Sequence, residues 1–225
     1  MTFSAVILAG GKSSRMGLDK ARLEIGGQTL LARQIGLARE AGATEVFISG
    51  RVGVDYSGFG CRVLVDKFPD AGPLSGIECG LAASPTPLLL VLAVDMAAMS
   101  AEFLRRLASH CTATTGAIPR VSGEIEPLAA FYPKAGWRLL VGDDVRSLKL
   151  KTENRTRKAE IDLSLVTSSP AEESKRAGPE AGAPGARDFA EACVANGVAV
   201  FVDLPGSDAK FFANWNSPAD LPCPN

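Results

Sequence analysis

The sequence predicts an α/β protein of three α/β/α layers, in which helices cover both faces of a mostly parallel sheet. Two observations carry this prediction. Short apolar runs alternate along the chain with amphipathic stretches of helical spacing. Four of these runs are also too uniformly apolar for half-exposed strands, which favours strands that are buried on both faces. The 225 residues suffice for one sizeable core.

Seven apolar runs are expected to form the strands of this sheet. The four that are expected to be buried on both faces are Ala5–Leu8, Glu45–Ser49, Arg62–Asp66 and Leu88–Val94. The other three are Ala117–Val121, Leu128–Tyr132 and Val198–Asp203. Each run has the usual length of a strand in a globular protein.

Four segments between these strands are expected to be helical. Residues 29–41 place Leu31, Ile35 and Ala38 on one face, and Gly42 suits the end of that helix. Ser100 can cap a second helix, whose buried stripe is Leu104, Leu107, Ala108 and Cys111. Further helices are expected from Leu74 onward and over Asp188–Asn196.

One segment departs from this alternation. Ser164–Arg187 is rich in Ser, Ala, Gly, Pro and Glu and has no apolar period. Such a composition cannot bury enough apolar surface to offset the entropy of ordering. We therefore expect a single domain over residues 1–225 with a flexible insertion at 164–187.

Composition excludes several classes of function. A net charge of −1 gives no general attraction to nucleic acid or to a membrane surface. Five cysteines, widely spaced and without a C-x-x-C pair, argue against a disulfide framework and a zinc site. No signal peptide is evident, and the longest apolar run is far below the ~20 residues that cross a bilayer. We expect a cytoplasmic protein.

The first strand runs directly into a glycine-containing loop, "LAGGKSSRMGLDKA". It is not a Walker A loop, because Val6 stands where that motif needs glycine, and Lys12 breaks the dinucleotide fingerprint. Gly10 and Gly11 nevertheless allow bare backbone N–H groups to approach an anion.

Two cations follow these glycines. Arg15 offers a planar fork for phosphate oxygens, and Lys20 offers a compact charge. Ligands of open α/β sheets bind outside the carboxyl ends of the strands, which favours a phosphate site here. The alternative is an ordinary glycine turn with solvated charges.

A carboxylate follows the apolar run of "LLLVLAVDM". Asp95 stands at the carboxyl end of that expected strand, near the proposed phosphate loop. Mg²⁺ typically takes one or two protein carboxylates, with waters and substrate phosphates as its other ligands. Asp95 is therefore a candidate Mg²⁺ ligand, and the alternative is a cap of the following helix.

Two further patterns have both a functional and a structural interpretation. Gly76 and Gly80 lie inside the expected helix "PLSGIECGL", where they indicate close approach either of a ligand or of the sheet. Asn214 and Asn216 alternate in "FFANWNSP", so in extended backbone both would point to one side and could contact a ligand. Asparagine is also a common turn residue.

These motifs, in this order and spacing, resemble the MobA family of molybdenum cofactor guanylyltransferases, within the MobA-like nucleotidyltransferases. The matching patterns are L-A-G-G-x-S-x-R-M-G-x-x-K, D…G-P-L-x-G-I-x-x-G-L, V-D-M, P-L-A-A-F-Y and F-x-N-x-N-x-P-x-D-L. The resemblance covers roughly Phe3–Gly142 and Val198–Leu221. It implies a glycosyltransferase-A-like (Rossmann-like) fold and transfer of GMP from Mg·GTP to the terminal phosphate of molybdopterin, with release of pyrophosphate.

The resemblance also implies a role for each matching residue. Nucleotide-binding positions would be Leu8, Ala9, Gly10, Gly11 and Asp66, with Arg15 and Lys20 on the phosphates. Asp95 would bind Mg²⁺, with Mn²⁺ as an alternative metal. Asn214 and Asn216 would lie near the pterin phosphate or the metal.

The implied partners are GTP and molybdopterin or molybdenum cofactor, with cofactor-assembly proteins or molybdoenzymes as candidate protein partners. Two other functions stay open at this point. One is a related nucleotidyltransferase, acting as a cytidylyltransferase on the same cofactor or on a sugar or polyol phosphate. The other is a nucleotide-binding protein without turnover, which the intact Arg15, Lys20 and Asp95 disfavour.

Overall fold

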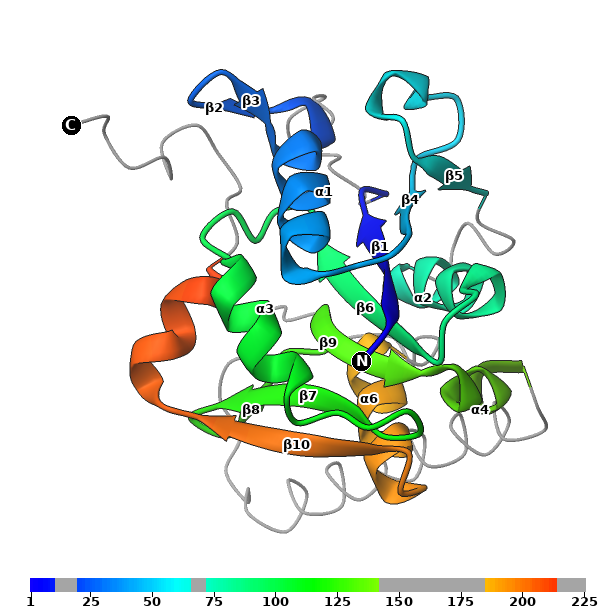
Figure 1. Cartoon of the computed structure of the whole chain (residues 1–225), viewed down its shortest axis with the longest axis vertical. Coiled ribbons are helices and arrows are strands. Elements are labelled where there is room, and N and C mark those ends of the chain that lie inside the picture. The colour runs from blue at the N-terminus through cyan, green and yellow to red at the C-terminus, as the bar shows by residue number, and fades with distance from the viewer. Residues whose placement is uncertain (11–19, 66–71, 142–184, 214–225) are drawn as a thin grey trace, which may run out of the picture.

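A computed structural model of the chain describes residues 1–10, 20–65, 72–141 and 185–213 (Figure 1). Its main sheet has the strand order β5-β4-β1-β6-β9-β7-β10, with β8 paired to β7. The strands are β1 (Phe3–Leu8), β4 (Val46–Ser49), β5 (Arg62–Leu64), β6 (Leu88–Ala93), β7 (Gly116–Val121), β8 (Glu124–Ile125), β9 (Ala129–Pro133) and β10 (Ala199–Leu204). All seven expected strands are confirmed, with ends that differ by at most two residues.

The prediction of a mostly parallel sheet is also confirmed. β1 is parallel to both β4 and β6, β4 is parallel to β5, and β7 is parallel to β10. β9 runs antiparallel to its neighbours β6 and β7. The sheet is therefore mixed, with one reversed strand between two parallel groups.

Helices form a layer on each face of this sheet, as expected (Figure 1). The layer on one face consists of α1 (Leu30–Ala41) and α3 (Ala101–Ala108), and the 3-10 helix η4 (Gly206–Phe212) packs in the same layer. The other face is covered by α2 (Pro73–Ala83), α4 (Trp137–Val141) and α6 (Ala186–Ala195). No helix among the described residues is long and apolar enough to cross a membrane.

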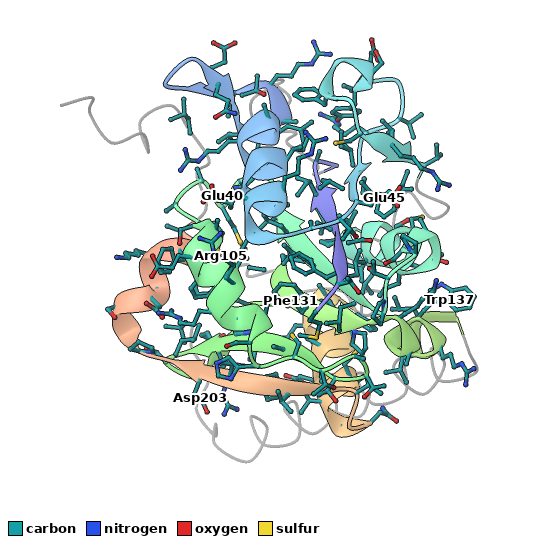
Figure 2. The ribbon with its side chains drawn as sticks, viewed as in Figure 1. Glu40, Glu45, Arg105, Phe131, Trp137 and Asp203 are labelled. Carbon is teal, nitrogen blue, oxygen red and sulfur yellow. The ribbon has the colours of Figure 1, made fainter. Side chains whose placement is uncertain are left out.

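Alternation along the central strands divides the core into two clusters. On β1, Ala5 and Ile7 pack in the cluster that contains α1 and α3, whereas Val6 packs in the cluster that contains α2 and α6. Phe131 of β9, labelled in Figure 2, meets Phe3 edge-on at a ring-centroid distance of 5.0 Å. Burial of both faces explains why the central strands are mostly apolar.

The expectation that the third run is buried on both faces is wrong. In β5 only Leu64 is buried, whereas Arg62 and Val63 are exposed. The reason is position: among the described strands β5 pairs with β4 alone, so it forms an edge of the sheet. A short apolar run does not reveal whether its strand lies at the centre or at the edge.

The helix ends follow the expected capping chemistry. Thr29 Oγ1 accepts a hydrogen bond from Ala32 N (3.2 Å), and Gly42 ends α1 with φ +108°. Ser100 Oγ accepts from Phe103 N (3.1 Å) and so caps α3. Arg105 then joins the two helices through the Glu40 carbonyl at 2.8 Å (Figure 2).

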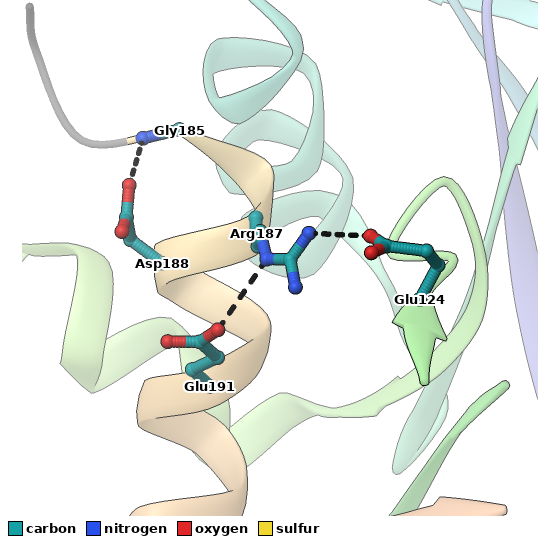
Figure 3. Close-up of polar contacts among 5 residues, drawn as sticks. All are labelled: Glu124, Gly185, Arg187, Asp188 and Glu191. Atoms are coloured by element: carbon teal, nitrogen blue, oxygen red, sulfur yellow. Dashed lines mark hydrogen bonds and ion pairs between the residues drawn. The ribbon is translucent and has the colours of Figure 1, made fainter. Parts of the chain in front are cut away.

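α6 begins inside the segment that we expected to be an insertion. Its helix starts at Ala186 rather than Asp188, so the predicted boundary at Arg187 is two residues too late. Asp188 accepts a hydrogen bond from Gly185 N (2.8 Å), and Arg187 bridges Glu191 (3.4 Å) to Glu124 (2.8 Å), as Figure 3 shows. Residues 164–184 lie outside the described residues, so the flexible insertion stays a prediction.

A hairpin that was not expected precedes α1. β2 (Glu24–Ile25) and β3 (Gln28–Thr29) are antiparallel and are joined by Gly26 and Gly27, both with positive φ. Positive φ at both central residues is the two-residue hairpin turn that glycine allows. The 3-10 helix η1 (Lys20–Arg22) leads into this hairpin, and η2 (Ser57–Phe59) and η3 (Lys134–Gly136) are the other short helices.

The two glycines in α2 serve close packing of that helix on the sheet. A Cβ on Gly76 would lie 2.5 Å from Ser49 Oγ and 2.6 Å from Leu8 Cδ2. A Cβ on Gly80 would lie 2.9 Å from Leu89 and 3.0 Å from Val6. Of the two interpretations of this pattern, helix–sheet packing is the one that the structure supports.

We predict opposite effects for alanine at two helical glycines. Gly76→Ala should lower the free energy of unfolding by about 1–3 kcal/mol, because the added methyl overpacks the interface. Gly36→Ala should raise it by about 0.5–1 kcal/mol, since Gly36 is exposed in α1 with no atom within 4 Å of an added Cβ. Urea denaturation of both variants measures the difference, and equal effects would contradict the packing role.

Candidate active site

The candidate site lies where β1 and β6 end side by side. Leu8, the last residue of β1, is paired with Ser49 of β4 and with Ala93 of β6. Beyond the strand ends, Ala9 N donates to Ser49 O (2.8 Å) and Val94 N donates to Leu8 O (3.2 Å). The segments that leave β1 and β6 therefore start as neighbours at one edge of the sheet.

The start of the glycine loop runs along β4. Ala9 is buried, whereas Gly10 is exposed. A Cβ on Gly10 would lie 3.4 Å from the carbonyl oxygen of Gly50, so the two backbones pass close to one another. Of the predicted nucleotide-binding positions, Leu8, Ala9 and Gly10 thus lie together at the carboxyl edge of the sheet.

Two predicted site residues, far apart in the sequence, form an ion pair at this edge. Lys20 Nζ donates to Asp95 Oδ2 at 3.1 Å. The Lys20 side chain is 24% exposed and that of Asp95 is 21% exposed, so both remain accessible to a ligand. The pair places a cation and a carboxylate, the two groups that a phosphate–metal complex needs, at the edge where β1 and β6 end.

Asp95 is not a helix cap. Ser100 caps α3, and Asp95 lies five positions earlier in the turn that follows β6. The capping interpretation is therefore wrong, and the carboxylate is available for another role.

The residues at this edge fit a magnesium ion that is bound partly by substrate. Asp95 supplies one partly exposed carboxylate, and no group of three or more His, Cys, Asp or Glu side chains suited to a metal occurs in the described part of the chain. Mg²⁺ commonly takes one or two carboxylates and completes its shell with waters and phosphate oxygens. Asp95 would be its protein ligand here.

A third segment reaches the same edge. Leu128, just before β9, accepts a hydrogen bond from Ala93 N (2.8 Å), so the loop that precedes β9 lies beside the end of β6. Glu126 in this loop is half-buried; burial, with a smaller contribution from Glu124, raises the pKa of its carboxyl. The backbone of Glu126 itself is held by β7, because its N–H donates to Pro119 O (2.9 Å).

The turn that carries Asp95 is held by side chains of α1. Gln34 Nε2 donates to Met96 O at 2.7 Å, and Arg33 Nε donates to Ala97 O at 3.0 Å. Neither residue was expected at the site from the sequence. A signal was present for Gln34, which falls among the buried positions of α1 although it is polar.

Five predicted site residues lie outside the described residues, and their roles stay predictions. They are Gly11, Arg15, Asp66, Asn214 and Asn216. The last described element before the two asparagines is η4, which Asp208 ties to Arg106 of α3 by an ion pair.

The chain is similar to known proteins over most of its first 158 residues. A family model described as the MobA-like NTP transferase domain matches residues 5–158. The chain is 43% identical over 133 residues to a probable molybdenum cofactor guanylyltransferase of Opitutus terrae, covering 58% of this chain and 66% of that protein. It is 37% identical over 148 residues to a protein of the same description from Pelotomaculum thermopropionicum, covering 66% and 71%. The matches thus span about two thirds of these relatives.

Solved structures share the fold. A nucleotidyl transferase from Methanothermobacter superimposes with a TM-score of 0.66 at 20% identity, over 97% of this chain and 94% of that chain. A Mycobacterium tuberculosis protein, solved in complex with manganese, superimposes with a TM-score of 0.54 at 15% identity, over 92% and 89%. At these identities the likeness concerns the fold alone.

Proposed function

The chain belongs to the family of MobA-like NTP transferase domains, and from this premise we propose that it is a Mg²⁺-dependent molybdenum cofactor guanylyltransferase. It transfers GMP from GTP to the terminal phosphate of molybdopterin or molybdenum cofactor and releases pyrophosphate. The observation that carries the proposal is the Lys20–Asp95 pair at 3.1 Å, at the edge where β1 and β6 end. The descriptions of the curated relatives support the choice of nucleotide and acceptor.

The reaction needs little covalent chemistry from the protein. An oxygen of the acceptor phosphate attacks the α-phosphorus of GTP, and the bond from that phosphorus to the pyrophosphate oxygen breaks. The attacking phosphate monoester is already mostly a dianion near pH 7, so no general base has to remove a proton. What the protein must supply is alignment of the two phosphates and neutralisation of the charge on their oxygens.

The described residues can supply both. Lys20, through its ammonium group, stabilises negative charge on the triphosphate, while the backbone at Leu8, Ala9 and Gly10 lines the nucleotide site. Asp95 would hold Mg²⁺, or Mn²⁺ in its place, which would supply further neutralisation of charge on the phosphate oxygens. Arg15 is proposed to act with Lys20 on the phosphates, and Asp66 to contact the nucleotide.

The acceptor side is assigned to the chain's C-terminal part. Asn214 and Asn216, which follow the end of η4 by two and four positions in the sequence, are proposed to contact the pterin phosphate or the metal. We further propose one cytoplasmic domain with a flexible insertion at 164–184. Candidate protein partners are cofactor-assembly proteins or molybdoenzymes that receive the product.

A pyrophosphate-release assay with all four NTPs, with and without molybdopterin, tests the proposed function. We expect release that requires GTP, molybdopterin and a divalent cation together. Preference for CTP would instead identify a cytidylyltransferase, and release with a sugar or polyol phosphate alone would change the acceptor. Nucleotide binding without release under any combination would indicate a protein that binds nucleotide without turnover.

A further inference from the structure

We propose that Gln34, assisted by Arg33, is a positioning residue that holds the turn of Asp95 so that its carboxylate stays available to the metal. The inference rests on the proposed function only in taking Asp95 as the ligand of a divalent cation. Both side chains come from α1 and reach carbonyl oxygens of the two residues that follow Asp95.

The turn itself has few strong backbone restraints. Met96 N donates to Ala93 O at 3.5 Å, the long limit of a hydrogen bond, and Met99 N donates to Met96 O at 3.1 Å. Gln34 Nε2 adds the shortest contact to this turn, 2.7 Å to Met96 O. The orientation of the peptide after Asp95 therefore depends on a side chain more than on the turn's own backbone.

Burial of the Gln34 amide costs free energy of folding. Gln34 is completely buried, and its Oε1 is the one buried side-chain oxygen or nitrogen without a hydrogen-bond partner among the described residues. An apolar side chain of similar size would avoid that cost. An apolar side chain cannot donate a hydrogen bond to Met96 O. We therefore attribute the presence of an amide at position 34 to this hydrogen bond.

α1 also supports the other half of the ion pair. Leu30 N, at the start of α1, donates to Leu23 O (2.8 Å), and Leu23 N donates to Lys20 O (3.1 Å). The same helix thus holds the backbone of Lys20 at its first turn and the turn of Asp95 one turn later. A rigid helix between the two gives the pair its fixed separation, as preorganised sites require.

The test measures divalent-cation binding rather than turnover. Mn²⁺ is titrated by electron paramagnetic resonance against the full chain, alone and with each of the four NTPs, so that the result depends on neither the acceptor nor the preferred base. Gln34→Leu should raise the Kd for Mn²⁺ by about 10- to 100-fold, the usual effect of removing a group that orients a metal ligand. Arg33→Met should shift the Kd in the same direction by a smaller factor.

A matched control separates positioning from general loss of stability. Ala41→Gly weakens the same helix at a buried position two turns beyond Gln34, so it should lower Tm and leave the Kd for Mn²⁺ unchanged. Folded Gln34→Leu with an unchanged Kd would overturn the proposal. If that variant does not fold, Arg33→Met decides, because Arg33 is exposed: a raised Kd supports the proposal and an unchanged Kd overturns it.

These outcomes are independent of those for the proposed function. A preference for CTP or a different acceptor in the pyrophosphate assay would revise the reaction and leave the Mn²⁺ titration as it is. Conversely, unchanged Mn²⁺ binding in the variants would remove the role of α1 while GTP-dependent release stands.

Discussion

Lys20→Met is expected to lower kcat/KM for nucleotidyl transfer by about 10²–10³-fold, the usual effect of removing one group that stabilises developing charge. Methionine keeps the length of the lysine side chain and removes its ammonium group. The Lys20–Asp95 pair is partly exposed and so adds only about 0–1 kcal/mol to stability. The variant should therefore fold normally, with a Tm close to that of the unsubstituted chain.

Arg22→Met is the matched control for this experiment. Arg22 lies in the same 3-10 helix as Lys20, but its guanidinium donates to Asp55 O (3.1 Å) rather than to Asp95. The control removes a neighbouring positive charge and should leave kcat/KM nearly unchanged. Equal losses in the two variants would reduce the role of Lys20 to general electrostatics, and an unchanged rate in Lys20→Met would remove it from the mechanism.

Asp95→Asn is expected to weaken the dependence of activity on the divalent cation. The amide keeps the shape of the carboxylate and loses its charge, so the metal has to be held by substrate and water. Loss of several kcal/mol of charge stabilisation corresponds to roughly 10²–10³-fold in kcat/KM. The concentration of Mg²⁺ at half-maximal rate should rise in parallel.

Glu102→Gln provides the comparison, because it removes one negative charge from the first turn of α3 without touching the turn of Asp95. Its metal dependence should match that of the unsubstituted chain. A response of Asp95→Asn to Mg²⁺ equal to that of Glu102→Gln would exclude Asp95 as the metal ligand.

Prediction from sequence worked best where one local signal decides the outcome. Ser100 caps its helix as expected, because a hydroxyl before an apolar helical stripe has a single good use. Thr29, which was expected to lie inside the first helix, is instead its cap. The β2–β3 hairpin was missed, although Gly26-Gly27 is a recognised turn signal of two-residue hairpins. Whether a strand lies at the edge or the centre of the sheet depends on the strands that pair with it. The sequence of the strand alone does not decide this, as the exposed Val63 shows.

The sequence predicts that Lys20 and Asp95 lie at the same edge of the sheet, but it does not predict the ion pair that joins them. Lys20 and Asp95 were each chosen from local pattern and family resemblance, and their contact arises because β1 and β6 pair with their carboxyl ends together. The support from Gln34 could be suspected from a polar residue on a buried helix face. Its target, Met96 O, could not, because only the tertiary fold brings α1 to that turn.

The pairing of β1 with β6 also bears on how the chain acquires its activity. Phe3 is paired with Leu88 and Gly116 with Ala199, so the sheet joins segments that are far apart along the chain. Such non-local pairings fold slowly, because the entropy of closing long loops is lost before the contacts form. Lys20 and Asp95 meet only once β1 and β6 are joined. A chain with its helices formed and its sheet incomplete would therefore lack the proposed Lys20–Asp95 site.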